Sequence, residues 1–286
     1  MKRKRLLVLL ALALLVGLAH HASLPVPTGP AEGTAIQGEA LHERPASSAT
    51  FRVGTFNIHG CKGADGRRDV DRVARCLEGL DFVALNEVHG PWFWQSGDQS
   101  AELGRRMGLA WQFAPGTRSW YHYEFGNGFL SGLPVVSWKR IPLEHAADRG
   151  YRNAVRVDLR HAGQTIHAVL SHVTRHDDAS RERQLRQVID LFLSLPEPAV
   201  LLGDMNSTAE DARIRDLLAV RGVSDPVGDK LGAKSAGRID WIFTRGLRTV
   251  DAGMRDDGAS DHPMVWAELV APEVKVRLAP GTRAGS

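Results

Sequence analysis

Cysteine is scarce in this chain, which contains only Cys61 and Cys76. One thiol precedes the first predicted helix and the other lies in it, and an exported protein meets oxidising conditions. Two alternatives stay open: the pair forms a disulfide that closes the loop before this helix, or Cys76 packs beside Val73 and Leu80. No cysteine follows the N-terminal apolar segment, which argues against a lipoprotein.

A long apolar run is also missing, because Leu6 to Ala19 is shorter than the ~20 residues that span a bilayer. Basic residues fill positions 2–5, and Gly17-Leu-Ala19 supplies small residues at the spacing of a cleavage site. Residues 1–22 are predicted to be a cleaved signal peptide, with an uncleaved N-terminal anchor as the alternative. The protein is expected to be exported, either periplasmic or secreted, or held at the membrane by this segment.

Neither sign of charge is in excess once this segment is set aside. The chain has 36 Lys and Arg against 33 Asp and Glu, but residues 2–5 are all basic, which leaves 32 against 33 and a net charge of −1. The composition therefore gives no support to nucleic-acid binding. A solvated face explains the local basic clusters at least as well. These clusters are Lys62 with Arg67 and Arg68, and Arg181 with Arg183 and Arg186.

Internal repeats are absent, and two stretches have the composition of irregular segments. Residues 23–50 are rich in Pro, Gly, Ala, Ser and Thr without apolar periodicity, which predicts a flexible linker. Residues 272–286 are predicted to be a disordered tail. Between them, residues 51–271 form one domain of about 220 residues, ample for a two-sheet core.

The apolar runs of this domain end in polar residues. Four runs share the design, at residues 51–57, 81–88, 165–172 and 199–206, and two more, at residues 238–243 and 260–266, carry their polar residues at the beginning. Helical spacing over residues 69–79 predicts a helix after the first run, with Gly79 as its C-cap. Strands and helices alternate, so an α/β fold is predicted whose functional side chains meet in one cleft at a sheet edge.

The polar residues at these ends suit one kind of chemistry. Carboxylates, carboxamides and histidines together can hold a hard divalent cation, bind a phosphate and activate water. The set is Asn57, Glu87, His172, Asp204, Asn206, Asp240, Asp261 and His262. Single members have bland alternatives, since Asp204 and Asn206 also suit a turn or the N-cap of a helix near Glu210. The whole set favours a hydrolytic metal site, to which cysteine is a poor ligand.

The motifs that contain these residues resemble, in this order, the signatures of the endonuclease/exonuclease/phosphatase superfamily. They are Phe56-Asn57, Asn86-Glu87-Val88, Gly126-Asn-Gly-Phe-Leu-Ser131, Ser171-His172-Val173, Gly203-Asp-Met-Asn-Ser207, Arg238-Ile-Asp-Trp-Ile-Phe243 and Ser260-Asp-His262. The resemblance spans residues 50–271. It implies a four-layer α-β-β-α sandwich, in which two mainly antiparallel sheets pack face to face with helices outside.

The resemblance also implies a role for each residue. Glu87 looks like the principal metal carboxylate, for magnesium or alternatively manganese, with Asp261 and Asn57 completing the metal environment. His262 resembles the residue that activates water, oriented by Asp240. Asp204 and Asn206 resemble the pair that contacts the phosphoryl group, and His172 a phosphate-binding or acid residue. Arg152, and again Asn57, match substrate-binding positions.

Two positions depart from the pattern or extend it. Asn86 stands where the family usually has glutamine, and the shorter carboxamide makes support of the metal ligand uncertain. Glu124 either orients His172 or is an exposed loop residue, which is the commoner case. Seven further histidines are interpreted as surface or structural residues, namely His59, His89, His122, His145, His161, His167 and His176.

The sequence predicts a monomeric, metal-dependent phosphodiesterase and leaves its substrate unassigned. The alternatives are a secreted endonuclease acting on DNA or RNA, a hydrolase of lipids like a sphingomyelinase or phospholipase C, and a non-catalytic phosphate-binding module. Aromatic residues in 91–94 and at Trp120, Tyr121 and Tyr123 could stack bases, touch a lipid interface or cover core. The loops, rather than the catalytic centre, are expected to decide the substrate.

Overall fold

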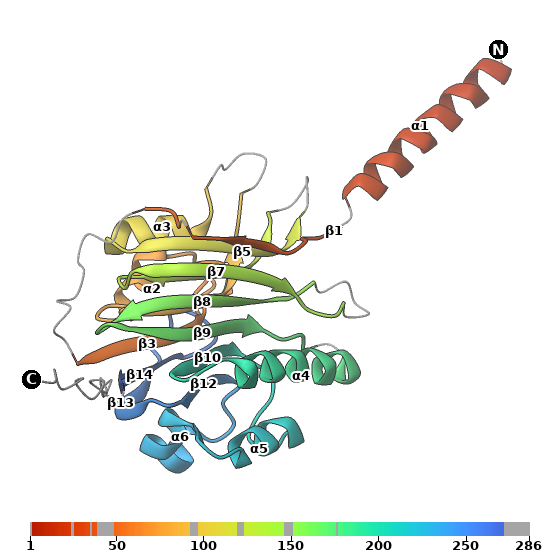
Figure 1. Cartoon of the computed structure of the whole chain (residues 1–286). Coiled ribbons are helices and arrows are strands. Elements are labelled where there is room, and N and C mark those ends of the chain that lie inside the picture. The colour runs from red at the N-terminus through yellow and green to blue at the C-terminus, as the bar shows by residue number, and fades with distance from the viewer. Residues whose placement is uncertain are drawn as a thin grey trace, which may run out of the picture.

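The protein is described by a computed structural model (Figure 1), which covers residues 2–23, 26–34, 36–38, 49–91, 97–118, 123–145, 151–175 and 177–271. The predicted tail and the aromatic residues Trp92, Phe93, Trp94, Trp120 and Tyr121 lie outside the described residues.

Two seven-stranded sheets form the centre of the domain. The first has the order β1-β5-β6-β4-β3-β14-β13. Its strands are β1 (Val26–Pro27), β5 (Ala110–Arg118), β6 (Phe125–Ser131), β4 (Phe82–His89), β3 (Thr50–Asn57), β14 (Met264–Val270) and β13 (Arg248–Arg255). All neighbouring strands in it are antiparallel except β3 and β4, which run parallel.

The second sheet has the order β11-β12-β10-β9-β8-β7-β2. Its strands are β11 (Val223–Ser224), β12 (Asp240–Arg245), β10 (Ala199–Asp204), β9 (Gln164–His172), β8 (Asn153–His161), β7 (Val135–Pro142) and β2 (Ala31–Gly33). Here too a single pair, β9 with β10, is parallel and the others are antiparallel. Each sheet therefore has one central parallel pair whose two carboxyl ends share an edge.

The helices cover the outer faces of the two sheets. On the first sheet lie α2 (Val70–Cys76) and α3 (Gln99–Met107), and on the second lie α4 (Asp178–Ser194) and α5 (Ala212–Ala219). The remaining helices are α1 (Lys2–Ser23), α6 (Pro226–Leu231) and the short 3-10 turns η1 (His59–Cys61) and η2 (Gly232–Ser235). Figure 1 shows α4 and α5 beside β10 and β12. The predicted four-layer α-β-β-α sandwich is confirmed.

Burial on both faces explains the unbroken apolar runs. In β4, Phe82 and Ala84 face the core between the sheets, whereas Val83 and Leu85 pack with α2 and α3. In β10, Val200 and Leu202 face the same central core and Leu201 packs under α4. Strands covered on both sides need apolar residues at every position, so alternation is lost.

The predicted helix at residues 69–79 is confirmed with a shorter span. Asp69 is its N-cap and accepts a hydrogen bond from the Arg72 amide at 2.9 Å. The helix ends at Cys76, and Gly79 follows with a φ of 82°. Cys61 and Cys76 are both buried and free, so the packing alternative holds in this structure.

Part of the predicted flexible linker is ordered against the domain, and the prediction is wrong for that part. β1 pairs with β5, and the Thr28 amide donates to Gly116 O at 3.0 Å. β2 pairs with β7 in the other sheet. Composition suggested irregular structure, but these short strands cover sheet edges that would otherwise expose unpaired backbone groups. α1 precedes them, and among the described residues no helix has the length and apolar character to cross a membrane.

Gly203 is the residue that most restricts the central parallel pair. Its φ is +141°, and a Cβ at this position would lie 1.9 Å from Ser171 O on β9. A residue with a side chain would suffer both backbone strain and a clash with main-chain atoms that cannot move independently.

Gly203→Ala is expected to lower the free energy of unfolding by about 2–4 kcal/mol, which combines ~1–3 kcal/mol of backbone strain with the clash. Urea unfolding measures it. Gly29→Ala is the matched control, because no atom lies within 4 Å of its Cβ position and its φ is not in the left-handed region. Equal stability of the two variants would contradict the expectation.

Candidate active site

The edge shared by the two parallel pairs gathers the predicted residues. Asn57 and Glu87 stand at or near the carboxyl ends of β3 and β4, and His172 and Asp204 end β9 and β10. Asp204 is the register partner of His172 on one side and of Asp240, the first residue of β12, on the other. Strand order alone therefore places three ionisable side chains next to one another.

Glu87 is aimed at this edge by a β-bulge in β4. The register with β6 shifts between Leu85 and Val88, and Glu87 has a φ of +56°. A left-handed conformation is costly for a residue with a side chain, and such outliers cluster at functional sites. The bulge releases the carboxylate from the sheet pattern while the rest of the strand stays paired.

A cavity of about 310 Å³ opens at the edge. It is lined by seven of the predicted residues, which are Glu87, Arg152, His172, Asp204, Asn206, Asp261 and His262, and also by His59, Phe125 and Arg175. His59 is partly exposed, as interpreted, but it also belongs to this cavity, because its Nδ1 lies 3.3 Å from Asp261 Oδ1. Its place two residues after Asn57, in the same polar strand end, was the signal that could have found it.

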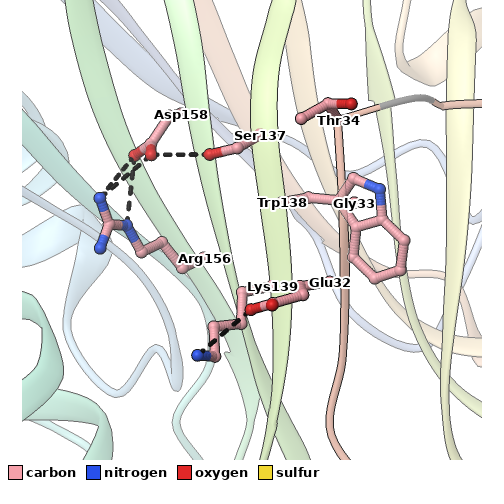
Figure 2. Close-up of a pocket in the computed structure, with 8 residues that line it drawn as sticks. All are labelled: Glu32, Gly33, Thr34, Ser137, Trp138, Lys139, Arg156 and Asp158. Carbon is pink, nitrogen blue, oxygen red and sulfur yellow. Dashed lines mark hydrogen bonds and ion pairs between the residues drawn. The ribbon is translucent and has the colours of Figure 1, made fainter.

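A second cavity, of about 460 Å³, lies at β2, β7 and β8 (Figure 2). Its charged groups already neutralise one another. Asp158 binds Arg156 and Ser137, and Lys139 lies 3.4 Å from Glu32. This cavity contains none of the predicted site residues.

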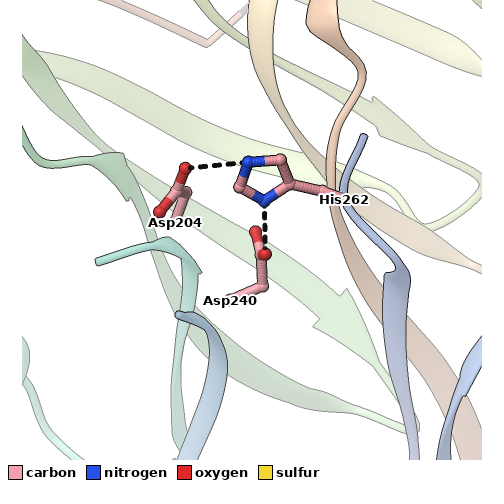
Figure 3. A group of neighbouring side chains, drawn as sticks. All are labelled: Asp204, Asp240 and His262. Atoms are coloured by element: carbon pink, nitrogen blue, oxygen red, sulfur yellow. Dashed lines mark hydrogen bonds and ion pairs between the residues drawn. The ribbon is translucent and has the colours of Figure 1, made fainter. Parts of the chain in front are cut away.

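His262 lies between two buried carboxylates (Figure 3). Its Nδ1 is 2.7 Å from Asp240 Oδ2, and its Nε2 is 3.9 Å from Asp204 Oδ2. Burial would lower the pKa of His262, but the bond to Asp240 and the charges of Asp240, Asp204 and Asp261 outweigh this and raise it to about 9. Burial raises the pKa of Asp240, and the bond to His262 opposes that rise.

Asp204 has three partners on its two oxygens besides His262. Its Oδ2 accepts from Asn57 Nδ2 at 3.0 Å and lies 3.3 Å from His172 Nε2, and its Oδ1 accepts from the Asn206 amide at 2.9 Å. Burial, followed by the charge of Asp240, raises the pKa of Asp204 to about 7. Asp204 can therefore exchange a proton near neutral pH.

His172 is held as a neutral imidazole. Arg152 lies 3.3 Å from its Nδ1, and a guanidinium can only donate, so Nδ1 accepts and Nε2 carries the hydrogen that faces Asp204. Burial lowers the pKa of His172 well below its usual value, and the charges of Arg152, His262 and Arg175 act in the same direction. Glu124, for which a role in orienting His172 was one alternative, instead pairs with Arg118 at 3.2 Å.

The carboxamide of Asn86 supports Asp204, which resolves its departure from the family pattern. Its Oδ1 accepts from the Asp204 amide at 3.0 Å, and its Nδ2 donates to Asn127 Oδ1 at 2.8 Å and Ser171 O at 3.1 Å. Asn127 in turn donates to Asn153. All three asparagines are buried, and this amide network (Asn86, Asn127 and Asn153) crosses between the two sheets.

Asn206, in the turn after β10, has both a structural role and a place in the site. Asn206 has a φ of +47°, and its Nδ2 donates to Val173 O at 2.8 Å, so it is a turn residue fixed to β9. It also lines the cavity. The structural reading of this residue and its place in the site are compatible.

The donor set fits a hard divalent cation. Four carboxylates lie at this edge, those of Glu87, Asp204, Asp240 and Asp261. Besides burial, the charges of Asp261 and Glu87 raise the pKa of Asp240. Asp240 Oδ1 is buried without a hydrogen-bond partner. Asn57 directs its amide nitrogen to Glu87 Oε1 at 3.3 Å, while its oxygen accepts from the His59 amide at 3.1 Å. Asn57 thus positions Glu87, and Glu87 with Asp261 offers carboxylate oxygens at the cavity wall.

One other group of potential ligands is compact. Among the described residues, Asp204, Asp240 and His262 place a ligand atom each within 4.8 Å of one another. Each nitrogen of His262 already faces a carboxylate in this group. The three residues are therefore better suited to moving a proton than to binding a metal ion.

Comparisons with known proteins agree with the predicted superfamily. The profile of the Endonuclease/Exonuclease/phosphatase family matches residues 54–262. A comparison with curated proteins gives no match.

Solved structures share the fold at low sequence identity. An endonuclease/exonuclease/phosphatase from Beutenbergia cavernae is 24% identical, with 78% of this chain and 72% of that chain covered and a TM-score of 0.64. TDP2 from D. rerio complexed with single strand DNA product is 18% identical, with 78% and 99% covered and a TM-score of 0.56. Sphingomyelinase C from Streptomyces griseocarneus is 17% identical, with 79% and 100% covered and a TM-score of 0.56.

Asn86→Ala is expected to lower the free energy of unfolding by about 2–4 kcal/mol, because the Asp204 amide, Asn127 Oδ1 and Ser171 O would each lose a buried hydrogen bond. Urea unfolding measures this change. The exposed Lys234→Ala is the surface control and should change stability by less than about 0.5 kcal/mol. A loss in Asn86→Ala no larger than in the control would show that the amide network does not support the site.

In the metal-free protein, the imidazole of His262 is expected to titrate near pH 9, above its usual 6.5. Because the folded-state pKa is raised, protonated His262 stabilises the fold fully below pH 6.5, and this contribution is lost as the pH rises towards 9. NMR of the ring C–H protons and urea unfolding across this window measure both effects. Asp240→Asn should lower the pKa, and an unchanged titration in that variant would contradict the pairing.

Proposed function

The chain belongs to the endonuclease/exonuclease/phosphatase family, and from this premise we propose that it is a metal-dependent phosphodiesterase. Membership of this family implies that the site acts on a phosphoester bond. The dependence on metal, with magnesium before manganese, and the choice of a diester are proposals that the side chains support.

The observation that carries the proposal is the position of His262 between the carboxylates of Asp240 and Asp204. His262 has one nitrogen on Asp240 at 2.7 Å, which fixes the tautomer and ring orientation, and turns the other towards the cavity beside Asp204. An imidazole so oriented can take a proton from water. Asp204, with a pKa raised to about 7, can give a proton to the leaving oxygen.

Cations on the facing wall complete the arrangement. Arg152 and Arg175 line the same cavity, and Arg152 is held between the ring of Phe125, 5.3 Å from its centroid, and His172. Two guanidinium groups can bind the equatorial oxygens of a phosphate, where charge spreads during the reaction. His172, neutral and buried, keeps Asp204 in place.

Glu87 and Asp261 would hold the metal ion, and Asn57 would orient Glu87. When bound, such an ion would supply charge neutralisation at the phosphate and would help to activate water. Partial neutralisation of Asp261 also removes one of the charges that raise the pKa of His262. The imidazole then moves towards the neutral form that a general base requires.

A binding module without hydrolysis is the weaker alternative. Phosphate binding needs the cations and the metal carboxylates, but it does not need a half-buried histidine held between two buried carboxylates. Such a group is costly to bury and has the geometry of acid–base catalysis. We also propose export of the protein, on the basic and apolar composition of residues 2–19 alone.

Glu87→Gln and His262→Asn are expected to separate metal binding from proton transfer. Both variants should lose roughly 10²–10⁴-fold in kcat/KM on a chromogenic phosphodiester. Mg²⁺ should raise the melting temperature of the wild type and of His262→Asn, but not of Glu87→Gln, because Glu87 is a proposed metal ligand and His262 is not. Chelator should abolish wild-type activity, and Mg²⁺ should restore it.

Exposed residues supply the matched controls, Glu210→Gln and His145→Asn, and both should keep full activity. Full activity in Glu87→Gln and His262→Asn would refute the site. The same assay is run on plasmid DNA, RNA, sphingomyelin, glycerophospholipids and inositol phosphates. Absence of hydrolysis across this panel would favour the binding module.

A further inference from the structure

Next to the phosphate cavity, Tyr123 and His89 form a stacked pair of rings in which Tyr123 is exposed. We propose that this stacking platform (Tyr123 on His89) binds a nucleobase of the substrate, one nucleotide away from the scissile phosphate. The proposal rests on the phosphodiesterase function proposed above. It assigns the substrate class that the catalytic residues leave open.

The two rings of the platform are closely parallel. Their centroids are 3.8 Å apart and their planes differ by 18°. The ring of His89 also lies against Gly60, where an added Cβ would be 2.3 Å from His89 Cε1. Tyr123 is 40% exposed and is the only aromatic residue among the exposed large hydrophobic ones in the described part of the chain. We expect a further planar group to stack on the exposed Tyr123.

The platform is fixed by hydrogen bonds before any substrate arrives. Arg68 donates to His89 Nδ1 at 2.8 Å, and the His89 amide donates to Gln99 Oε1 at 2.9 Å. The residue after Tyr123 is tied to the end of β4, because the Gly90 amide donates to Glu124 O at 2.7 Å. A preformed ring pair loses little conformational entropy on binding.

The platform lies next to two residues that line the cavity, Phe125 and His59. His89 follows Glu87 by two residues on β4, and its ring centroid is 6.2 Å from that of Phe125, which lines the cavity. On the other side, Gly60 is the neighbour of His59, a second lining residue. A phosphate in the cavity and a planar group on Tyr123 therefore fit adjoining parts of one ligand.

The loop beside the platform is positively charged. Lys62, Arg67 and Arg68 lie between η1 and α2, all exposed, and the bridge between Lys62 and Arg68 closes the loop. Its acids offset only part of this charge, since Asp65 and Asp69 share Arg72 as their partner and the basic residues Lys62, Arg67 and Arg68 remain in excess. Lys62 and Arg67 form no ion pair within the described residues. Exposed cations beside an aromatic platform are the arrangement that binds single-stranded nucleic acid.

A lipid surface is a poorer match. Outside α1, the other exposed large hydrophobic residues in the described part of the chain are single valines, at Val26, Val136, Val220 and Val250. Insertion into a bilayer needs a contiguous apolar patch, whereas one ring suffices to stack a base.

Four dinucleotides test the proposal with the full-length protein and Mg²⁺. They are thymidylyl-(3′→5′)-thymidine and its analogues in which the 3′-side, the 5′-side or both nucleosides are replaced by base-free 1,2-dideoxyribose. In the wild type, loss of the stacked base should lower kcat/KM by roughly 5- to 100-fold. Tyr123→Ala should lower cleavage of thymidylyl-thymidine by the same factor and lose the discrimination.

The compound without bases is the internal control. Its unchanged cleavage by Tyr123→Ala shows that the variant is folded, and Tyr123→Phe should behave as the wild type because it keeps the ring. Equal wild-type rates on all four compounds would overturn the proposal while leaving phosphodiesterase activity intact. Cleavage of sphingomyelin but of no dinucleotide would overturn it in favour of a lipid. Failure on every phosphodiester would instead refute the proposed function.

Discussion

The fold and the site depend on a single buried carboxylate, Asp204, at the junction of the two sheets. Its backbone belongs to one sheet, yet Asn86 binds its amide and Asn57 binds its side chain from the other. Two sheets packed through apolar contacts alone could slide by a fraction of a residue, since such contacts have little direction. Directional bonds at Asp204 fix the register between the layers, and with it the distances within the site.

Much of this arrangement could be predicted because the signals are local. Apolar runs ending in polar residues located the strands, and Glu87, His172 and Asp204 stood where those runs stopped. The α-β-β-α layering followed from the ordered motifs. The bulge at Glu87 was not predictable, because a shift of register depends on the partner strand β6, which is 40 residues further along the chain.

Other errors came from contacts that a sequence does not display. The role of Asn86 depends on a strand of the opposite sheet, so reading it beside Glu87 alone suggested weak support. The strands in residues 26–33 are too short to show a pattern, and only the edges they cover give them structure. His59 was set aside because a lone histidine carries no signal until Asp261, two hundred residues away, is placed beside it. Long-range pairing, rather than local propensity, decided each case.

The two short strands at the beginning of the domain also have a mechanical consequence. Within eight residues the chain forms the outermost strand of both sheets, β1 next to β5 and β2 next to β7. If the N-terminus were held at a surface, tension on the chain would reach these edge hydrogen bonds first. β4 and β9 lie further in, behind two strands in each sheet. The edge strands β1 and β2 would then separate first under tension, while the catalytic geometry stays intact.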